Sequence, residues 1–336
     1  MAAKVFGSIG DTLILEAEIG SKAGARAKIL TYGAVLRDLT IPVAGALQRV
    51  TLGLNSIEDY VAHSPSFGAV PGRFANRIAH GRFTLDGEAY TLDRKEGAAH
   101  TLHGGSKGFG KRVWKLGEHS ADAVELTLVS EDGNMGFPGQ MRASCRYSFV
   151  EPATLRVELK AVADKPTLVN LTQHAYFNLD GSPDILDHLL ELGSDFYTPS
   201  DAELIPTGEI RAVANTPYDF RTARTIRNPQ GATYDTNFVV ARMAGPDGLA
   251  FVARLKSPRN GLALELHSTE PGVQVYDSAK LNCPVPGLDG ALYGAHAGLC
   301  LEPQAFPDSP NRRHFTDTVL RPDREYSHIS EFRFLA

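Results

Sequence analysis

The chain has 336 residues, of which 43% are hydrophobic, so it is long enough to bury a full core. Its formal net charge of -5 and its scattered Lys and Arg residues argue against a nucleic-acid-binding surface. No segment has the length of an apolar membrane span, and residues 1–8 lack the apolar run of a secretory signal. We therefore expect a cytoplasmic protein that binds a small molecule and has no nucleic-acid or membrane partner.

The predicted secondary structure is almost entirely β. In chain order, a short helical turn at 57–62 is followed by four segments in which apolar and polar residues alternate, at 124–128, 155–160, 262–267 and 332–334. A period of two indicates half-buried strands, and 32 Gly and 20 Pro residues separate them at short intervals. This pattern is typical of a sandwich or barrel, and no stretch has the composition of a linker. The sequence predicts one large antiparallel all-β domain over residues 1–336.

Polar residues gather at several places where their neighbours are Gly, aromatic or aliphatic. An unpartnered polar group in such surroundings costs roughly 1 to 3 kcal/mol, so each needs a partner, and a ligand can be one. The segments are residues 72–78, 100–105, 171–179, 234–238 and 301–308, with 272–276 as a weaker sixth.

Two of these segments offer titratable side chains, His174 and Glu302, each isolated among apolar neighbours. An unperturbed imidazole titrates near pH ~6.5 and a carboxylate near ~4.3, so partial burial can bring both within reach of proton transfer at neutral pH. His174 and Glu302 are therefore the candidate acid and base.

Together these segments resemble the aldose 1-epimerase, or galactose mutarotase, family. The shared motifs, in the family's order, are Gly-Arg-Phe-Ala-Asn-Arg-Ile, Leu-His-Gly-Gly, Thr-Gln-His-Ala-Tyr-Phe-Asn-Leu, Pro-Gly-Val-Gln and Leu-Glu-Pro-Gln-Ala-Phe-Pro-Asp, and the similarity extends from about Leu30 to the C-terminus. The resemblance implies a β-sandwich of the galactose mutarotase type with a sugar-binding cleft on one sheet face. It further implies an isomerase, monomeric or homodimeric, that interconverts the α and β anomers of a free aldose such as galactose or glucose without a cofactor or metal.

The resemblance also implies roles for particular residues. Glu302 matches the family's catalytic base and His174 its acid. The family's substrate-binding residues match Asn76, Arg77, His103, Tyr176, Asp235 and Gln274.

The chain departs from the family pattern at two places. Thr236 stands where many members have His, and Asp277, Ser278 and Ala279 stand where a Thr-Gly-Asn type of sequence is common. Both places are expected to line the cleft, so we expect them to influence the preferred sugar more than the reaction.

Anomer exchange requires two opposed proton-transfer groups, because the C1 hydroxyl loses a proton while the ring oxygen gains one. A carboxylate near the C1 hydroxyl and an imidazolium near the ring oxygen open the ring to the aldehyde, and each transfer contributes roughly 10²- to 10⁴-fold. Rotation about the C1–C2 bond exposes the other carbonyl face, and the reversed transfers close the ring. His103 could donate to the C1 oxygen and Arg77 to two hydroxyls, while Asp235 would accept from hydroxyls.

Several of these binding residues also have an ordinary structural explanation. Asn76 could be a turn residue, although Phe74 and Ile78 beside it argue for a packed site. Asp235 could cap an Asx turn, and Arg77 could pair with a carboxylate on the opposite strand. By alternation Gln274 points away from the core, which suits a cleft floor and plain solvent equally. Either Tyr176 or Phe177 could pack on the sugar ring.

Neither a metal site nor a phosphate loop is expected. Cys145, Cys283 and Cys300 lack the spacing of a disulfide framework or zinc site and are predicted to be small core residues. His100 and His103 would point to opposite faces of an extended strand. Residues 105–111 have the Gly and Lys spacing of a phosphate loop, but Arg112 stands where Ser or Thr should hold magnesium, so a surface loop is predicted.

Two other functions remain open. An epimerase for a hexose 6-phosphate would need cationic side chains that converge on the phosphate, for which Lys107, Lys111 and Arg112 are candidates. A non-catalytic sugar-binding module would keep the cleft and lack the chemistry, although the presence of both His174 and Glu302 argues against it.

Overall fold

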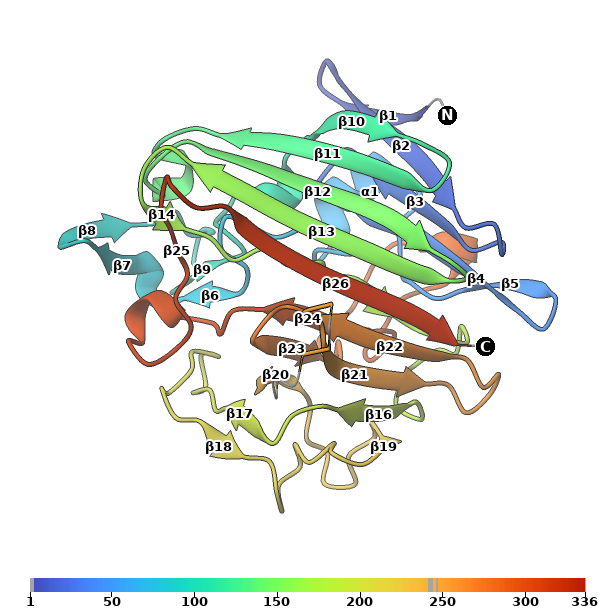
Figure 1. Ribbon diagram of the computed structural model, residues 1–336. Helices are drawn as coiled ribbons and strands as arrows, with labels where there is room; N and C mark the ends of the chain where they lie inside the picture. The colour runs from blue at the N-terminus through green and yellow to red at the C-terminus, as the bar shows by residue number, and fades with distance from the viewer. Residues whose placement is uncertain (1–2, 241–243, 246, 336) are drawn as a thin grey trace.

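Antiparallel sheets make up nearly all of the regular structure (Figure 1). This computed structural model describes residues 3–240, 244–245 and 247–335. Apart from Leu262, which directly precedes its strand, the four alternating segments lie in strands that pair antiparallel, and this confirms the predicted all-β class. The predicted helical turn is α1 (Ile57–His63), which begins where the Ser56 hydroxyl accepts a hydrogen bond from the backbone N–H of Asp59. No helix among the described residues is long and apolar enough to cross a bilayer.

The largest sheet has nine strands, and Figure 1 shows its long strands lying side by side from green to red. Alternation determines its buried face: Leu155, Val157 and Leu159 are at most 1% exposed, whereas the residues between them are only partly covered or exposed. In pairing order its strands are β10 (Lys115–His119), β11 (Ala123–Ser130), β12 (Met141–Val150), β13 (Thr154–Ala163), β26 (Tyr326–Leu335), β22 (Ala263–Ser268), β21 (Ala250–Lys256), β16 (Leu189–Leu192) and β19 (Arg224–Thr225).

A six-stranded sheet and a five-stranded sheet complete the large elements. The six-stranded sheet consists of β15 (Tyr176–Phe177), β24 (Leu299–Gln304), β23 (Gly272–Tyr276), β20 (Asp235–Val239), β17 (Phe196–Thr198) and β18 (Arg211–Ala212). The five-stranded sheet consists of β1 (Lys4–Ile9), β2 (Thr12–Gly20), β3 (Arg26–Leu30), β4 (Leu36–Val43) and β5 (Ala46–Arg49). The smaller elements are the pairs β6 (Arg77–Ile78) with β9 (Thr101–Leu102), β7 (Arg82–Leu85) with β8 (Glu88–Thr91) and β14 (Thr167–Leu168) with β25 (Val319–Leu320), and the 3-10 turns η1 (Ala79–Gly81), η2 (Phe109–Lys111), η3 (Asn134–Gly136), η4 (Leu288–Gly290) and η5 (Ser309–Asn311).

The nine-stranded and six-stranded sheets each bury one face in the same core. Phe177, Val275 and Leu301 of the smaller sheet are fully buried in one cluster with Phe332 of the larger, and the rings of Phe177 and Phe332 are 5.2 Å apart. The three cysteines are also buried and free, as predicted. Because side chains alternate along a strand, the neighbours of Phe177, Val275 and Leu301 point to the opposite face of the smaller sheet.

Two positions on β13 test this assignment of faces. We expect Leu159→Ala, at a fully buried position, to lower the free energy of unfolding by about 2–5 kcal/mol, because it leaves a cavity in the core. Val162 lies on the same strand and is 41% exposed, so Val162→Ala should cost less than about 0.5 kcal/mol. Urea denaturation monitored by circular dichroism measures both, and equal losses would contradict the assigned faces.

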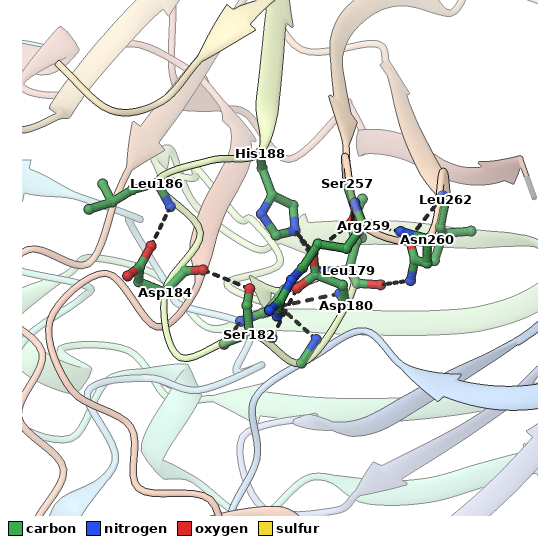
Figure 2. A network of polar contacts seen from close by, with 12 residues as sticks. Leu179, Asp180, Ser182, Asp184, Leu186, His188, Ser257, Arg259, Asn260 and Leu262 are labelled. Carbon is green, nitrogen blue, oxygen red and sulfur yellow. Dashed lines mark hydrogen bonds and ion pairs between the residues drawn. The ribbon is translucent and has the colours of Figure 1, made fainter.

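A buried polar network holds the loop between β15 and β16 against the hairpin of β21 and β22 (Figure 2). The Ser257 hydroxyl donates to Asp180 Oδ2 at 2.6 Å, and Asn260 Nδ2 donates to the Leu179 carbonyl at 2.9 Å. The Leu179 backbone N–H donates to His188 Nε2 at 3.2 Å. Ser257, His188 and Asp180 are the residue types of a nucleophilic triad, but the hydroxyl is directed to the carboxylate and not to the imidazole. The network, which we call the clasp, is therefore structural and not catalytic.

Candidate active site

The face of the six-stranded sheet that points away from the core carries two rows of polar and aromatic side chains. In the first row Asn237, Gln274 and Glu302 lie opposite one another on β20, β23 and β24. His174 continues this row, because Tyr176 pairs with Cys300 on β24 and His174 lies two residues before Tyr176. The second row consists of Asp235, Tyr276, Cys300 and Tyr176.

Apart from Asn237 and Cys300, the residues of these rows form the floor of a cavity of about 430 Å³. A volume of this order lies in the range of about 300–1,000 Å³ that is typical of small-molecule sites. The structure brings all eight predicted site residues to this cavity, three of them from the loops and short strands above the sheet. They are Asn76, Arg77 and His103 on the walls, and His174, Tyr176, Asp235, Gln274 and Glu302 on the floor.

His174 and Glu302 face each other directly. The imidazole Nε2 is 3.5 Å from Glu302 Oε2, and the two residues are only 5% and 2% exposed. The ring of Tyr176 stacks on the imidazole with centroids 5.2 Å apart and planes inclined by 13°. Of the two aromatic candidates, Tyr176 therefore faces the cavity, whereas Phe177 lies in the core.

Burial moves the pKa values of this pair in opposite directions. It lowers the pKa of His174 to about 4, and it raises the pKa of Glu302 well above its usual value, an effect that the nearby Asp235 charge strengthens and Arg77 opposes. Both shifts favour the neutral forms, the imidazole and the carboxylic acid, and the two groups lie 3.5 Å apart. Among the described atoms, His174 Nδ1 and Glu302 Oε2 have no hydrogen-bond partner, which is uncommon for buried polar atoms.

The hydrogen bonds of His103 fix its tautomer. The backbone N–H of Asn76 donates to His103 Nδ1 at 3.2 Å, so Nδ1 is the bare nitrogen and Nε2 carries the hydrogen. Burial lowers the pKa of His103 well below its usual value, and the neighbouring His174 and Arg77 reinforce this effect. His103 is therefore a neutral hydrogen-bond donor on the cavity wall.

Asn76 and Arg77 enter the cavity at a sharp bend of the chain. Asn76 has a positive φ of 62° and is 5% exposed, so it is both a turn residue and part of a packed site. The residue opposite Arg77 on the paired strand is Leu102, so the cross-strand ion pair considered for Arg77 does not form there. The guanidinium is instead close enough to Glu302 and His103 to affect their pKa values.

Asp235 and Gln274 form a hydrogen-bonded pair on the floor. Gln274 Nε2 donates to Asp235 Oδ1 at 2.6 Å, which orients the carboxylate and leaves Oδ2 for a ligand. Asp235 lies in a strand and not in an Asx turn. Gln274 is 4% exposed, so it belongs to the cleft floor and not to a solvent-facing surface.

Two predictions about the cavity walls are wrong. His100 and His103 line the same cavity, because the strand before His103 ends at Leu102 and His103 has a positive φ of 52°, so extended-strand alternation does not apply. Residues 105–111 are more than a surface loop, since Gly105, Gly108, Gly110 and Lys111 contribute to the wall.

The family departures lie beside this cavity and not in it. Thr236, Asp277 and Ala279 line an adjoining cavity that shares Asp235 and Tyr276 with the first. The Asp277 carboxylate accepts from the backbone N–H groups of Tyr234 and Ala279, each at 3.1 Å. Ser278 is fully buried and donates to a carbonyl. The expectation that these residues line the cleft itself is therefore wrong for the His174 cavity.

Sequence reasoning missed several lining residues. Tyr276 lies two positions after Gln274 on the same strand, so its side chain is on the same face and also lines the cavity floor. Strand alternation was the signal that could have identified it. The others come from loops, where no periodicity predicts direction. They include Pro65, Ser66, Lys95, Leu204 and Lys280.

One group of described side chains comes close enough to hold a metal ion. The ligand atoms of His174, Cys300 and Glu302 all lie within 4.8 Å of one another. Burial raises the pKa of the Cys300 thiol well above its usual value, which favours the protonated form, whereas the thiolate is the form that binds metals. The donor set therefore suits proton transfer between His174 and Glu302 better than metal binding.

Comparisons with known proteins agree with this geometry. The family model for aldose 1-epimerases matches residues 16–333. The galactose mutarotase of Bos taurus is 39% identical over 316 residues, which cover 92% of this chain and 91% of that protein, and the aldose 1-epimerase of Escherichia coli K12 is 36% identical over 330 residues, 94% of each. A solved aldose epimerase homologue from C. elegans has a TM-score of 0.90 at 32% identity and covers 95% of this chain and 98% of its own, which confirms the predicted sandwich type. The chain therefore belongs to the aldose 1-epimerase family of isomerases.

Proposed function

We propose that this enzyme interconverts the α and β anomers of a free aldose such as galactose or glucose, and that Glu302 is its base and His174 its acid. The observation that carries the proposal is the buried pair on the cavity floor, with Nε2 and Oε2 3.5 Å apart. The sequence identity with relatives named galactose mutarotase and aldose 1-epimerase supports a free aldose as the substrate.

The reaction begins with one proton on the pair. Transfer from Glu302 to His174 gives the carboxylate and imidazolium that ring opening requires. The carboxylate then removes the proton of the C1 hydroxyl while the imidazolium protonates the ring oxygen. His103 donates through Nε2 to the C1 oxygen as it gains carbonyl character, and the same transfers in reverse close the ring on the other face.

The remaining polar residues hold the sugar hydroxyls during this exchange. Asp235 accepts through the oxygen that Gln274 leaves free, and Arg77 donates through its fixed fork of N–H groups. Asn76 and Gln274 extend the polar lining, and the Tyr176 ring beside His174 gives an apolar surface for the sugar ring. Tight positioning is what makes two weak proton-transfer groups effective.

The three cationic residues suggested as phosphate ligands give little support to a hexose 6-phosphate as the substrate. Of the three, Lys111 lines the cavity, whereas Lys107 is not among its lining residues and the Arg112 guanidinium donates to the Val129 carbonyl at 2.8 Å. Polarimetry on freshly dissolved α-galactose, α-glucose and α-glucose 6-phosphate tests the choice. Turnover of the phosphate alone would reject a free aldose, and a rate equal to buffer for all three, with sugar still bound, would indicate a binding module.

The pKa shifts predict an unusual pH profile for kcat/KM. Because burial lowers the pKa of His174 from 6.5 to about 4, the pair keeps a single proton as the pH falls through 6.5, and activity should decline only near pH 4, where a second proton removes the base. At alkaline pH activity should fall once the raised pKa of Glu302 is passed, since the pair then lacks a proton to donate. Polarimetry with the buffer rate subtracted at each pH measures this profile. An acid limb centred near pH 6.5 would contradict it.

A further inference from the structure

We propose that Asn170 is a positioning residue that fixes the Glu302 strand and the Asn76 bend relative to each other beside His174. This inference rests on the roles proposed for Glu302 and His174. Asn170 is fully buried and does not line the cavity, so it acts through other residues and not on the sugar.

The Asn170 side chain joins two segments of the site. Its Nδ2 group donates to the carbonyls of Ala75 at 3.2 Å and Ala305 at 3.4 Å. Its Oδ1 accepts from the backbone N–H of Ala305 at 3.0 Å. Both amide hydrogens and the carbonyl are therefore used, and each goes to the backbone of a segment that carries a site residue.

The backbone of Asn170 strengthens the same connection. The Ala75 N–H donates to the Asn170 carbonyl at 2.7 Å, and the Asn170 N–H donates to the Arg73 carbonyl at 3.0 Å. Ala75 directly precedes Asn76, whose N–H and carbonyl both bond to His103. Through Ala75 and Asn76, Asn170 therefore also positions His103, the proposed donor to the C1 oxygen.

The contact with Ala305 matters because it lies just past the end of β24. Glu302 is held on one side by its pairing with Gln274 on β23. The hydrogen bonds between β23 and β24 end at Gln304, and the next residue, Ala305, is bonded to the Asn170 side chain instead. The backbone of His174 is held separately, through hydrogen bonds with Gly68 and Ala69. Loss of the Asn170 side-chain amide removes its contacts with Ala305, whereas the backbone bonds to Arg73 and Ala75 remain. The Glu302 segment should therefore shift relative to His174 and to the Asn76 bend.

Asn170→Ala tests the proposal against a matched control, Asn178→Ala. Asn178 is also a buried asparagine, 5% exposed, whose side chain donates to two backbone carbonyls, those of Ser182 and Ala297, and accepts from the N–H of Gly181. Both variants should lower Tm. Measured by polarimetry at least 15 °C below the lower Tm, only Asn170→Ala should lose kcat, by between about ten- and hundredfold, because a misplacement on the order of 1 Å costs about that much. KM should rise as well, since Glu302 no longer keeps its position relative to Asn76 and Arg77.

Asn170→Asp serves if the alanine variant does not fold. The isosteric side chain keeps the acceptor for Ala305 and loses at least one of the two donated bonds. We therefore expect its kcat to lie below that of the wild type and, where the alanine variant folds, above that of Asn170→Ala. Values of kcat and KM within twofold of Asn178→Ala would overturn the proposal, because the role of Asn170 would then be only structural. Failure of the Glu302 and His174 roles is distinguishable, since Glu302→Gln and His174→Asn would then retain turnover whatever Asn170 does.

Discussion

Glu302→Gln is expected to lower kcat by roughly 10²- to 10⁴-fold with little change in KM. The amide keeps the shape of the carboxylate but cannot remove the proton of the C1 hydroxyl, so the loss falls on the transition state and not on sugar binding. Polarimetry with α-galactose gives kcat and KM, and a thermal shift with added galactose checks that the sugar still binds.

The matched control for this change is Glu331→Gln. Glu331 is also a buried carboxylate, 7% exposed, but it lies on β26 and pairs with Arg156 and Arg333. Its amide variant should lose stability and keep kcat. Unchanged turnover in Glu302→Gln, or an equal loss in both variants, would reject Glu302 as the base.

His174→Asn is expected to reduce kcat by a similar factor. Asparagine retains a polar side chain of comparable length but cannot carry a proton to the ring oxygen. If His174 and Glu302 exchange one proton as proposed, the double variant should be little worse than either single variant, as is usual for groups that act as a unit. Rate measurements on the two single variants and the double variant give the coupling directly.

His188→Asn is the control for the histidine. His188 is 1% exposed and accepts from Leu179 in the clasp of Figure 2, well separated in role from the cavity. Loss of this bond should lower Tm without a change in kcat. A His174→Asn variant that behaves like His188→Asn would show that His174 is a satisfied buried histidine and not an acid.

Much of the fold was readable from the sequence because strand alternation is a local property. Residues 155–160 alternate in the sequence and alternate between buried and partly covered in the structure. The same rule could not decide whether Gln274 lies on a cleft floor or in solvent, since alternation shows which face of the sheet a side chain joins but not what covers that face. Asn76 and His103 adopt positive φ angles of 62° and 52°, which non-glycine residues rarely adopt and which no periodicity signals. For that reason the shared cavity of His100 and His103 was not predicted.

The sequence by itself determined the all-β class and supplied an imidazole and a carboxylate in apolar surroundings. Only the tertiary structure decided that they meet, because His174 and Glu302 are far apart in the chain and come into one row through the pairing of β15 with β24. The opposed pKa shifts were decided there too, since they arise from burial that the whole fold creates. The identity of each residue is a local property of the sequence. Strand pairing and desolvation depend on contacts between distant segments, and these contacts determine the separation and the pKa shifts of His174 and Glu302.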